Sequence, residues 1–456
     1  MQFLWQHSWN ALVASIALLF LSFAAMPASA QSSPASSPTS TVSVQPLASV
    51  AAAPAFDPVK ATNAYLAQVK GEARAKSDAY FEGSAEWLPL VDTIYALLVA
   101  ALLMWTRLSA RFRNIAQGVT RSRFWQVPIV IVFYVVLTTV LTFPLTVYEE
   151  FIREHAYGLS NQNFIQWFGD FGIEFGINLI AFLVVGSVIY AIIRRFKETW
   201  WMWAALAMTG FYIVGAVIAP VAIAPLLNHY YPVPDSPLKQ QILSLARSEG
   251  IPVNNVYEFD ASKQSKRISA NVSGMFGTTR ISMTDNLLIR STPEEVKAVL
   301  GHEMGHYVLD HGMIGSIWQG LLFFVIFGLV HWGFKRLTSL FGGNWDVRTV
   351  DDPAGLTVLM ALGAFFFLLA TPVQNTMTRV LEQQADMFGV NAARQPDGFA
   401  KAALQLSEYR KLEPTPWEEF IFYDHPSGRT RIWTVMRWKA EHINDPDIKA
   451  GPVSPQ

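Results

Sequence analysis

The stretch GHEMGHYVLDH, residues 301–311, places His302, Glu303 and His306 in an H-E-x-x-H pattern directly before a long apolar run. Residues four apart lie on one face of a helix, so both imidazoles can hold one metal ion. Glu303 lies about 100° around the helix from His302, near the ion without being an obvious ligand. Zinc lowers the pKa of bound water towards about 7, and a carboxylate beside it can take the proton. The stretch therefore predicts a zinc site with a general base.

The residues around this motif predict the elements that carry it. Thr292 is a preferred N-cap and Glu295 completes a capping box, so a helix should begin there and run to about Leu309. Upstream, β-branched and aromatic residues in 252–261 predict a strand, and residues 268–288 predict a hairpin. The motif should then lie on a helix outside the bilayer.

A catalytic zinc site needs a third protein ligand and leaves the fourth position for water. The chain has no cysteine, so this ligand must be a histidine or a carboxylate. A histidine six residues after His306 is excluded, because position 312 is glycine. The segment RVLEQQADMFGV (379–390) instead supplies Glu382, with Asp386 one turn later on the same face. We expect Glu382 to complete the ligand set and Asp386 to accept the free N–H of one ligand imidazole.

The composition indicates an integral membrane protein. Of 456 residues, 52% are hydrophobic and only 15% are charged. A hydrocarbon core needs about 20 apolar residues per helix. Six runs come close to that length: 87–105, 127–147, 175–193, 200–223, 313–331 and 356–373. Net charge is -1 and there is no basic stripe outside short loops, so nothing indicates binding to nucleic acid.

The two motifs resemble the type I CAAX prenyl proteases, membrane-embedded zinc metalloendopeptidases of the gluzincin clan. The likeness covers roughly residues 141–432 and includes four further blocks in the same order: TFPLTVYEEFIREHAYGLSNQNFIQWFGD, IAPLLNHYYPVPDSPLK, SANVSGMFGTTRISMTDNLL and DHPSGRTRI. The resemblance implies a mainly α fold, in which a bundle of tilted membrane helices surrounds a water-filled chamber and a small α+β zinc-peptidase domain closes one end.

Carried over position by position, the resemblance implies that His302, His306 and Glu382 are zinc ligands. It implies that Glu303 is the general base and that Asp386 is a proton donor.

An H-P-x-x-x-x-R pattern in the C-terminal segment adds His425 and Arg431 to the implied site. His425 can donate a hydrogen bond to the oxyanion that forms at the scissile carbonyl, although a His-Pro turn is often only a helix entry. Arg431 is placed with the substrate-binding residues, while its chemistry also suits an ion pair with Asp386 or Asp424. Asn271 can hold a substrate backbone added as a further strand at the sheet edge, or be a polar residue of the sheet face.

These patterns divide the chain into four parts. Residues 1–30 predict a signal peptide, with a short apolar run and an A-x-A cleavage site, although an uncleaved first membrane helix is the alternative because no Lys or Arg precedes the run. Residues 31–60 are rich in Ser, Pro and Ala and predict a disordered linker. Residues 61–223 should form membrane helices. Residues 224–456 should form the zinc metallopeptidase domain, including two further membrane helices.

We therefore expect an integral-membrane zinc metalloendopeptidase that binds one Zn²⁺ per chain and hydrolyses peptide bonds. Its expected partners are the lipid bilayer and a peptide or membrane-protein substrate, lipid-modified or not, and its expected location is a bacterial inner membrane. The alternative is a transporter or scaffold with a structural zinc, neither of which would need Glu303.

Loop charges predict the orientation of the zinc face. The short loops of one side hold eleven basic residues, and the short loop of the other side holds only Arg153. The eleven are Arg107, Arg111, Arg113, Arg121, Arg123, Arg194, Arg195, Lys197, Lys335, Arg336 and Arg348. Because basic loops stay in the cytoplasm, the zinc face should be extracytoplasmic. The resemblance implies the reverse, because eukaryotic relatives present the zinc domain to the cytosol.

Overall fold

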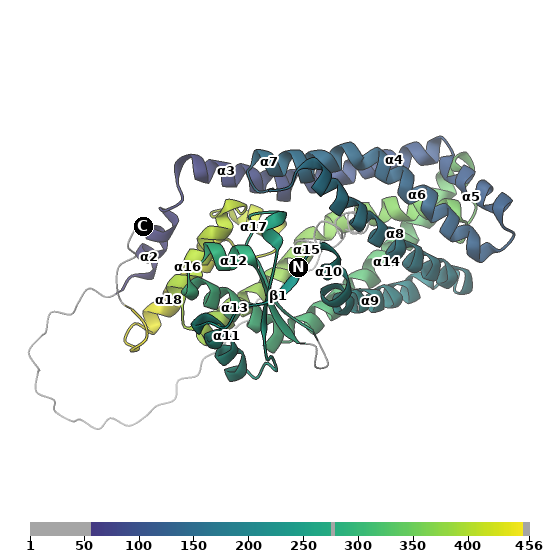
Figure 1. Ribbon diagram of the computed structural model, residues 1–456. Coiled ribbons are helices and arrows are strands. Elements are labelled where there is room, and N and C mark those ends of the chain that lie inside the picture. The colour runs from purple at the N-terminus through teal and green to yellow at the C-terminus, as the bar shows by residue number, and fades with distance from the viewer. Residues whose placement is uncertain (1–55, 275–278, 450–456) are drawn as a thin grey trace, which may run out of the picture.

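The computed structural model describes residues 56–274 and 279–449. The segment predicted as a signal peptide and most of the linker lie outside the described residues. The molecule is elongated, with α4, α5, α6, α8 and α9 towards one end and α2, α11, α13, α16 and α18 towards the other (Figure 1). The long helices α14 and α15 connect the two ends, so the membrane part and the extramembrane part share continuous elements.

The N-terminal half is almost entirely helical. Its elements are α2 (Pro58–Leu66), α3 (Gly71–Phe81), η1 (Glu82–Trp87), α4 (Leu88–Trp105), α5 (Leu108–Val119), α6 (Arg123–Thr146), η2 (Val147–Arg153), α7 (Glu154–Ala156), α8 (Phe164–Arg195), α9 (Trp200–Ile218), η3 (Ala219–Ile223) and α10 (Ala224–Leu227).

The C-terminal half adds a small sheet and the remaining helices. Its elements are β1 (Tyr230–Pro232), α11 (Pro237–Ser248), β2 (Val256–Phe259), η4 (Ala261–Lys263), β3 (Ala270–Ser273), β4 (Arg280–Thr284), α12 (Asp285–Arg290), α13 (Pro293–Val308), α14 (His311–Trp345), η5 (Pro353–Gly355), α15 (Leu356–Ala393), α16 (Pro396–Gln405), η6 (Leu406–Glu408), α17 (Pro416–Phe422) and α18 (Gly428–Glu441).

Six helices of the described part are long and apolar enough to cross a membrane, which confirms the number predicted from the apolar runs. They are 71–105, 123–156, 164–195, 200–227, 311–345 and 353–393. Only 11% of the most apolar window is buried in the second and third of these helices, against 50% in the last. Most side chains of the second and third helices therefore lie outside the protein core, and the mainly α membrane fold class predicted from the sequence is confirmed.

Helix α2 begins at Pro58, inside the segment 31–60 whose composition predicts a linker. The Asp57 side chain accepts hydrogen bonds from the backbone N–H groups of Val59 and Lys60, at 2.9 and 3.1 Å, and Pro58 suits the first helical position. The Tyr65 hydroxyl donates to Asp397 at 2.8 Å and its ring packs in the core of the C-terminal helices. This contact holds the start of the described chain on the side of the motif helix α13.

The sheet has the order β1-β2-β4-β3, with β2 and β4 parallel and the other pairs antiparallel. The strand predicted in 252–261 and the two strands of the hairpin in 268–288 are confirmed, while β1 was not predicted. Alternate residues of β3 and β4, such as Ala270 and Ile281, pack in one core with Leu300 and Met304 of α13. Strand β3 is therefore an edge strand of a sheet that lies against the motif helix.

Helices α13 and α15 cross at unusually close range because small residues meet there. A Cβ added at Gly389 of α15 would lie 2.7 Å from the backbone nitrogen of His302, and one added at Gly301 would lie 3.0 Å from the Gly389 carbonyl oxygen. Gly305 of α13 faces the backbone of Ala385 in the same way. This approach brings the second half of α15 directly onto the H-E-x-x-H turn.

We expect Gly389→Ala to destabilise the fold by about 1–3 kcal/mol, because a methyl group cannot enter this crossing without moving a helix. Thermal unfolding of the detergent-purified protein measures the change. Gly343→Ala is the matched control, since a Cβ there meets no atom within 4 Å. Equal stability of the two variants would show that α13 and α15 can move apart to accommodate the added methyl group at no measurable cost.

Candidate metal centre and active site

Helix α13 begins as predicted, and local contacts fix its register. Glu295 donates its backbone N–H to the Thr292 hydroxyl at 3.4 Å, and the Thr292 backbone N–H donates to the Glu295 carboxylate at 3.1 Å. The helix ends at Val308, and Asp310, with φ at 53°, turns the chain into α14. The motif thus lies on a short helix of its own, next to a membrane helix.

The two motif histidines and Glu382 come together where α13 and α15 cross. The Nε2 atoms of His302 and His306 are 3.1 Å apart. Glu382 Oε2 lies 3.1 Å from His302 Nε2, and Glu382 Oε1 lies 3.5 Å from His306 Nε2. Ligands bound tetrahedrally to zinc at about 2.0–2.1 Å stand about 3.3–3.4 Å from one another. The spacing of these three donors therefore fits one ion.

The state of Glu382 also fits a cation. The residue is 1% exposed, and its Oε2 lies 3.1 Å from His302 Nε2 and 3.2 Å from His425 Nε2 without a hydrogen bond of suitable geometry from any described residue. In native proteins, buried carboxylate oxygens normally accept hydrogen bonds or bind cations, because leaving one unpaired is costly. Burial alone would lower the pKa of the His302 imidazole, but the adjacent Asp386 and Glu382 carboxylates raise it to about 10. Negative charge is thus concentrated where an ion would bind.

Asp386 fixes the first motif histidine and is itself held by Arg431. Its Oδ1 lies 2.8 Å from His302 Nδ1, and Arg431 donates to both of its oxygens, at 2.9 and 2.6 Å. A carboxylate in such a bidentate contact stays ionised, which suits it to orient His302 rather than to donate a proton. Arg431 is 8% exposed, and its guanidinium makes the ion pair with Asp386 that its chemistry suits, while its predicted contact with a substrate stays a prediction.

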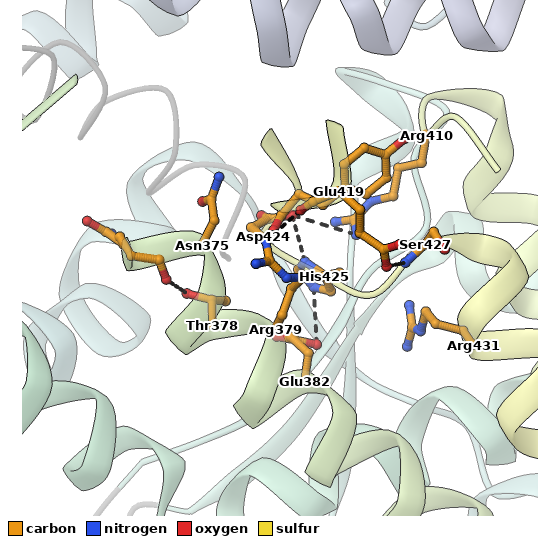
Figure 2. Close-up of polar contacts among 12 residues, drawn as sticks. Asn375, Thr378, Arg379, Glu382, Arg410, Glu419, Asp424, His425, Ser427 and Arg431 are labelled. Atoms are coloured by element: carbon orange, nitrogen blue, oxygen red, sulfur yellow. Dashed lines mark hydrogen bonds and ion pairs between the residues drawn. The ribbon is translucent and has the colours of Figure 1, made fainter. Parts of the chain in front are cut away.

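His425 reaches the same centre from the C-terminal segment, as Figure 2 shows. Its Nε2 lies 3.2 Å from Glu382 Oε2, and its Nδ1 lies 2.9 Å from Asp424 Oδ1. Burial would raise the pKa of the Asp424 carboxyl, but the facing His425 holds it well below its usual range. The sequence interpretation considered Asp424 only as a partner of Arg431, so its contact with His425 was missed.

The loop that carries His425 is fastened to α15 by Arg379, one turn before Glu382 (Figure 2). Its guanidinium donates to the backbone carbonyls of Glu419, at 2.7 Å, and Tyr423. Because Tyr423 directly precedes Asp424, these bonds set the position of the loop relative to Glu382. No sequence signal pointed to this role.

Asn271 lies in the edge strand β3, and its register partner in β4 is Ser282. Both amide atoms of Asn271 and the hydroxyls of Ser273 and Ser282 are buried without a hydrogen-bond partner among the described residues. Unsatisfied buried polar atoms are rare in native structures. The polar groups of Asn271 and Ser273 are thus buried and unpaired on the edge strand, where the sequence predicts a contact between Asn271 and a substrate. Glu303 is half-buried on α13, directly after His302.

Together, the membrane helices, the crossed α13 and α15 and the His-His-Glu set define a membrane-embedded metallopeptidase. A model of peptidase family M48 matches residues 232–439, and a model described as CAAX prenyl protease N-terminal, five membrane helices, matches residues 61–229. Within 61–229 the structure has four of the candidate membrane helices. The chain belongs to this family of CAAX prenyl protease-like membrane metallopeptidases, as its motifs predict.

Similar proteins agree with this assignment. An uncharacterized metalloprotease, YhfN of Bacillus subtilis, is 28% identical over 73% of this chain and 78% of its own length. CAAX prenyl protease 1 of Saccharomyces cerevisiae is 27% identical over 67% of this chain and 70% of its own length. The crystal structure of S. mikatae Ste24p matches 83% of this chain and 95% of that chain, with a TM-score of 0.69 and 22% identity, which shows a shared fold.

We expect Glu382→Ala to lose its metal, because the change removes one of three protein ligands. Metal analysis of the purified protein measures the loss. Gln383→Ala, at the exposed neighbouring position, is the control and should bind metal like the parent. A full metal content in Glu382→Ala would mean that another residue is the third ligand.

Proposed function

We propose that this membrane metallopeptidase is a zinc enzyme that holds one Zn²⁺ per chain on His302, His306 and Glu382. The observation that supports the proposal most directly is the position of the buried Glu382 carboxylate, whose oxygens lie 3.1 Å from His302 Nε2 and 3.5 Å from His306 Nε2, while these two nitrogens are 3.1 Å apart. His and carboxylate ligands with the fourth position left for water are the usual donor set of catalytic zinc. Bound there, zinc would polarise the scissile carbonyl and make a water molecule more acidic.

Different residues of the chain transfer the proton and stabilise the developing charge. Glu303 takes a proton from the attacking water and delivers it to the leaving amine. His425, held through Nδ1 by Asp424, donates from Nε2 to the oxyanion of the tetrahedral intermediate. Asp386 keeps His302 in the orientation that a ligand needs, and Arg431 keeps Asp386 ionised. Asp386 and Arg431 are therefore positioning residues in this proposal.

The substrate binds as an extended segment along β3, the edge strand beside α13. An added strand would pair with the β3 backbone, while Asn271 supplies an amide donor and acceptor that are unpaired within the described residues. We propose a membrane-protein or lipid-modified peptide as the substrate, because the site lies where α13 meets the membrane helix α14. The name of the yeast relative makes prenylated C-terminal peptides one specific candidate.

We further propose that the zinc face is extracytoplasmic in a bacterial inner membrane. The structure gathers several basic loops at one end, where Arg113 pairs with Asp346 at 2.6 Å and Arg123 pairs with Asp351 at 2.9 Å. The loop with Arg153 lies at the other end, where Glu154 pairs with Arg267 of the zinc domain at 2.8 Å. Since the basic end should be cytoplasmic, the zinc domain would face outward.

Glu303→Gln should keep zinc at about one ion per chain but reduce peptidase activity by about 100-fold or more, because it removes the base and spares the ligands. Zinc analysis and peptide hydrolysis by the same preparation measure the two properties. An active variant would refute the mechanism. The inactive variant also serves as a substrate trap, and proteins that accumulate on it in the membrane fraction identify the substrate class.

A reporter experiment tests the orientation. Alkaline phosphatase inserted near Gly343 should be inactive, and the same enzyme fused after Gln456 should be active, because it folds only outside the cytoplasm. The reverse pattern would place the zinc domain in the cytoplasm and favour an uncleaved N-terminal helix.

A further inference from the structure

His311 is a buried histidine beside the ligand set that has no role in the proposed function. It is the first residue of α14 and is 4% exposed. Its Nδ1 lies 2.9 Å from Nδ1 of His306, and its Nε2 lies 3.1 Å from Oε1 of Gln384 on α15. The three side chains form a hydrogen-bonded relay that starts at a metal ligand and ends at an amide.

We propose that this relay holds His306 in the tautomer that can bind the ion. A contact between two Nδ1 atoms needs one proton between them. If His306 carries that proton, its Nε2 keeps a lone pair for the ion. If His311 carries it, a neutral His306 has its proton on Nε2, where it blocks the ion.

The orientation of the Gln384 amide in the structure matches the first arrangement. Its Oε1 faces His311 Nε2 and accepts a proton from it. A neutral imidazole carries one N–H, so His311 Nδ1 is left as an acceptor for the His306 N–H. His311 is therefore a positioning residue that acts on the metal through His306.

The two histidine ligands are thus supported in different ways. His302 is oriented by the Asp386 carboxylate, at 2.8 Å, whereas His306 depends on a neutral imidazole and an amide. The His306 side chain is also more exposed, 23% against 9% for His302. The bond between His306 and the ion should therefore break more easily than the bond to His302. Breaking the relay should lower the affinity for the metal.

The inference rests on the proposed ligand set, and zinc affinity tests it without reference to activity. His311→Leu removes the acceptor, while His311→Asn keeps an amide oxygen near the position of Nδ1. The zinc dissociation constant, measured by competition with a chromophoric chelator, should rise about 10–100-fold in the Leu variant and recover largely in the Asn variant. The absorption spectrum of the cobalt(II)-substituted protein should change in the same order, because it reports ligand geometry.

Gln384 offers a second test with a matched control. Gln384→Glu can only accept, so it should preserve zinc affinity, whereas Gln384→Lys can only donate and should reverse the relay and weaken binding. The same two substitutions at Gln383, the exposed neighbour, change the charge without the contact to His311. A difference between Glu and Lys that is much larger at position 384 than at 383 supports the relay, and equal differences at the two positions would overturn it.

His306→Ala separates the possible failures. If it abolishes zinc binding while His311→Leu binds like the parent, the relay is refuted and the proposed ligand set stands. If His306→Ala retains zinc, the ligand set fails and the inference fails with it. Equal losses in the Leu and Asn variants, accompanied by lower thermal stability of their metal-free forms, would assign His311 to packing and overturn the positioning role.

Discussion

The close crossing of α13 and α15 is the constraint on which the site depends. Each helix alone carries only part of the ligand set, and neither can hold an ion with the geometry of a catalytic site. Gly301 and Gly305 on one helix and Gly389 on the other remove the side chains that would keep the backbones apart. Glu382 then stands one ligand-to-ligand spacing from His302, at 3.1 Å. Packing of small residues thus determines the chemistry.

The close crossing of α13 and α15 buries negatively charged carboxylates, and other groups of the protein must compensate their charge. Glu382 and Asp386 are both almost fully buried, and an uncompensated buried carboxylate costs several kcal/mol. Arg431 compensates Asp386 by a bidentate contact, and His302 and His425 flank Glu382. Among the described residues no basic side chain other than imidazole pairs with Glu382, so a divalent cation would complete the balance. The charge arrangement and the ligand geometry lead independently to the same position.

The sequence was most informative where the deciding contacts are local. The capping box of Thr292 and the four-residue spacings of His302 with His306 and of Glu382 with Asp386 follow from helix periodicity, and the structure has them on helices α13 and α15. The contact of His425 with Asp424 and the relay through His311 were not foreseen. The contacted pairs are only one and five residues apart, but they form in a loop and at a helix end, where no regular backbone period sets the directions of the side chains.

The N-terminal helix α2 was also not predicted from the sequence. Its Asp57 cap and Pro58 are local signals, but they follow a long Ser/Pro/Ala-rich segment whose composition dominated the interpretation. What stabilises so short a helix is tertiary, since Tyr65 enters the core formed by α16 and α18. Helix α18 in turn carries Arg431, the residue that keeps Asp386 in place. The beginning of the described chain therefore supports the helix on which the orientation of His302 depends, and α2 and the metal centre are joined through one packed core.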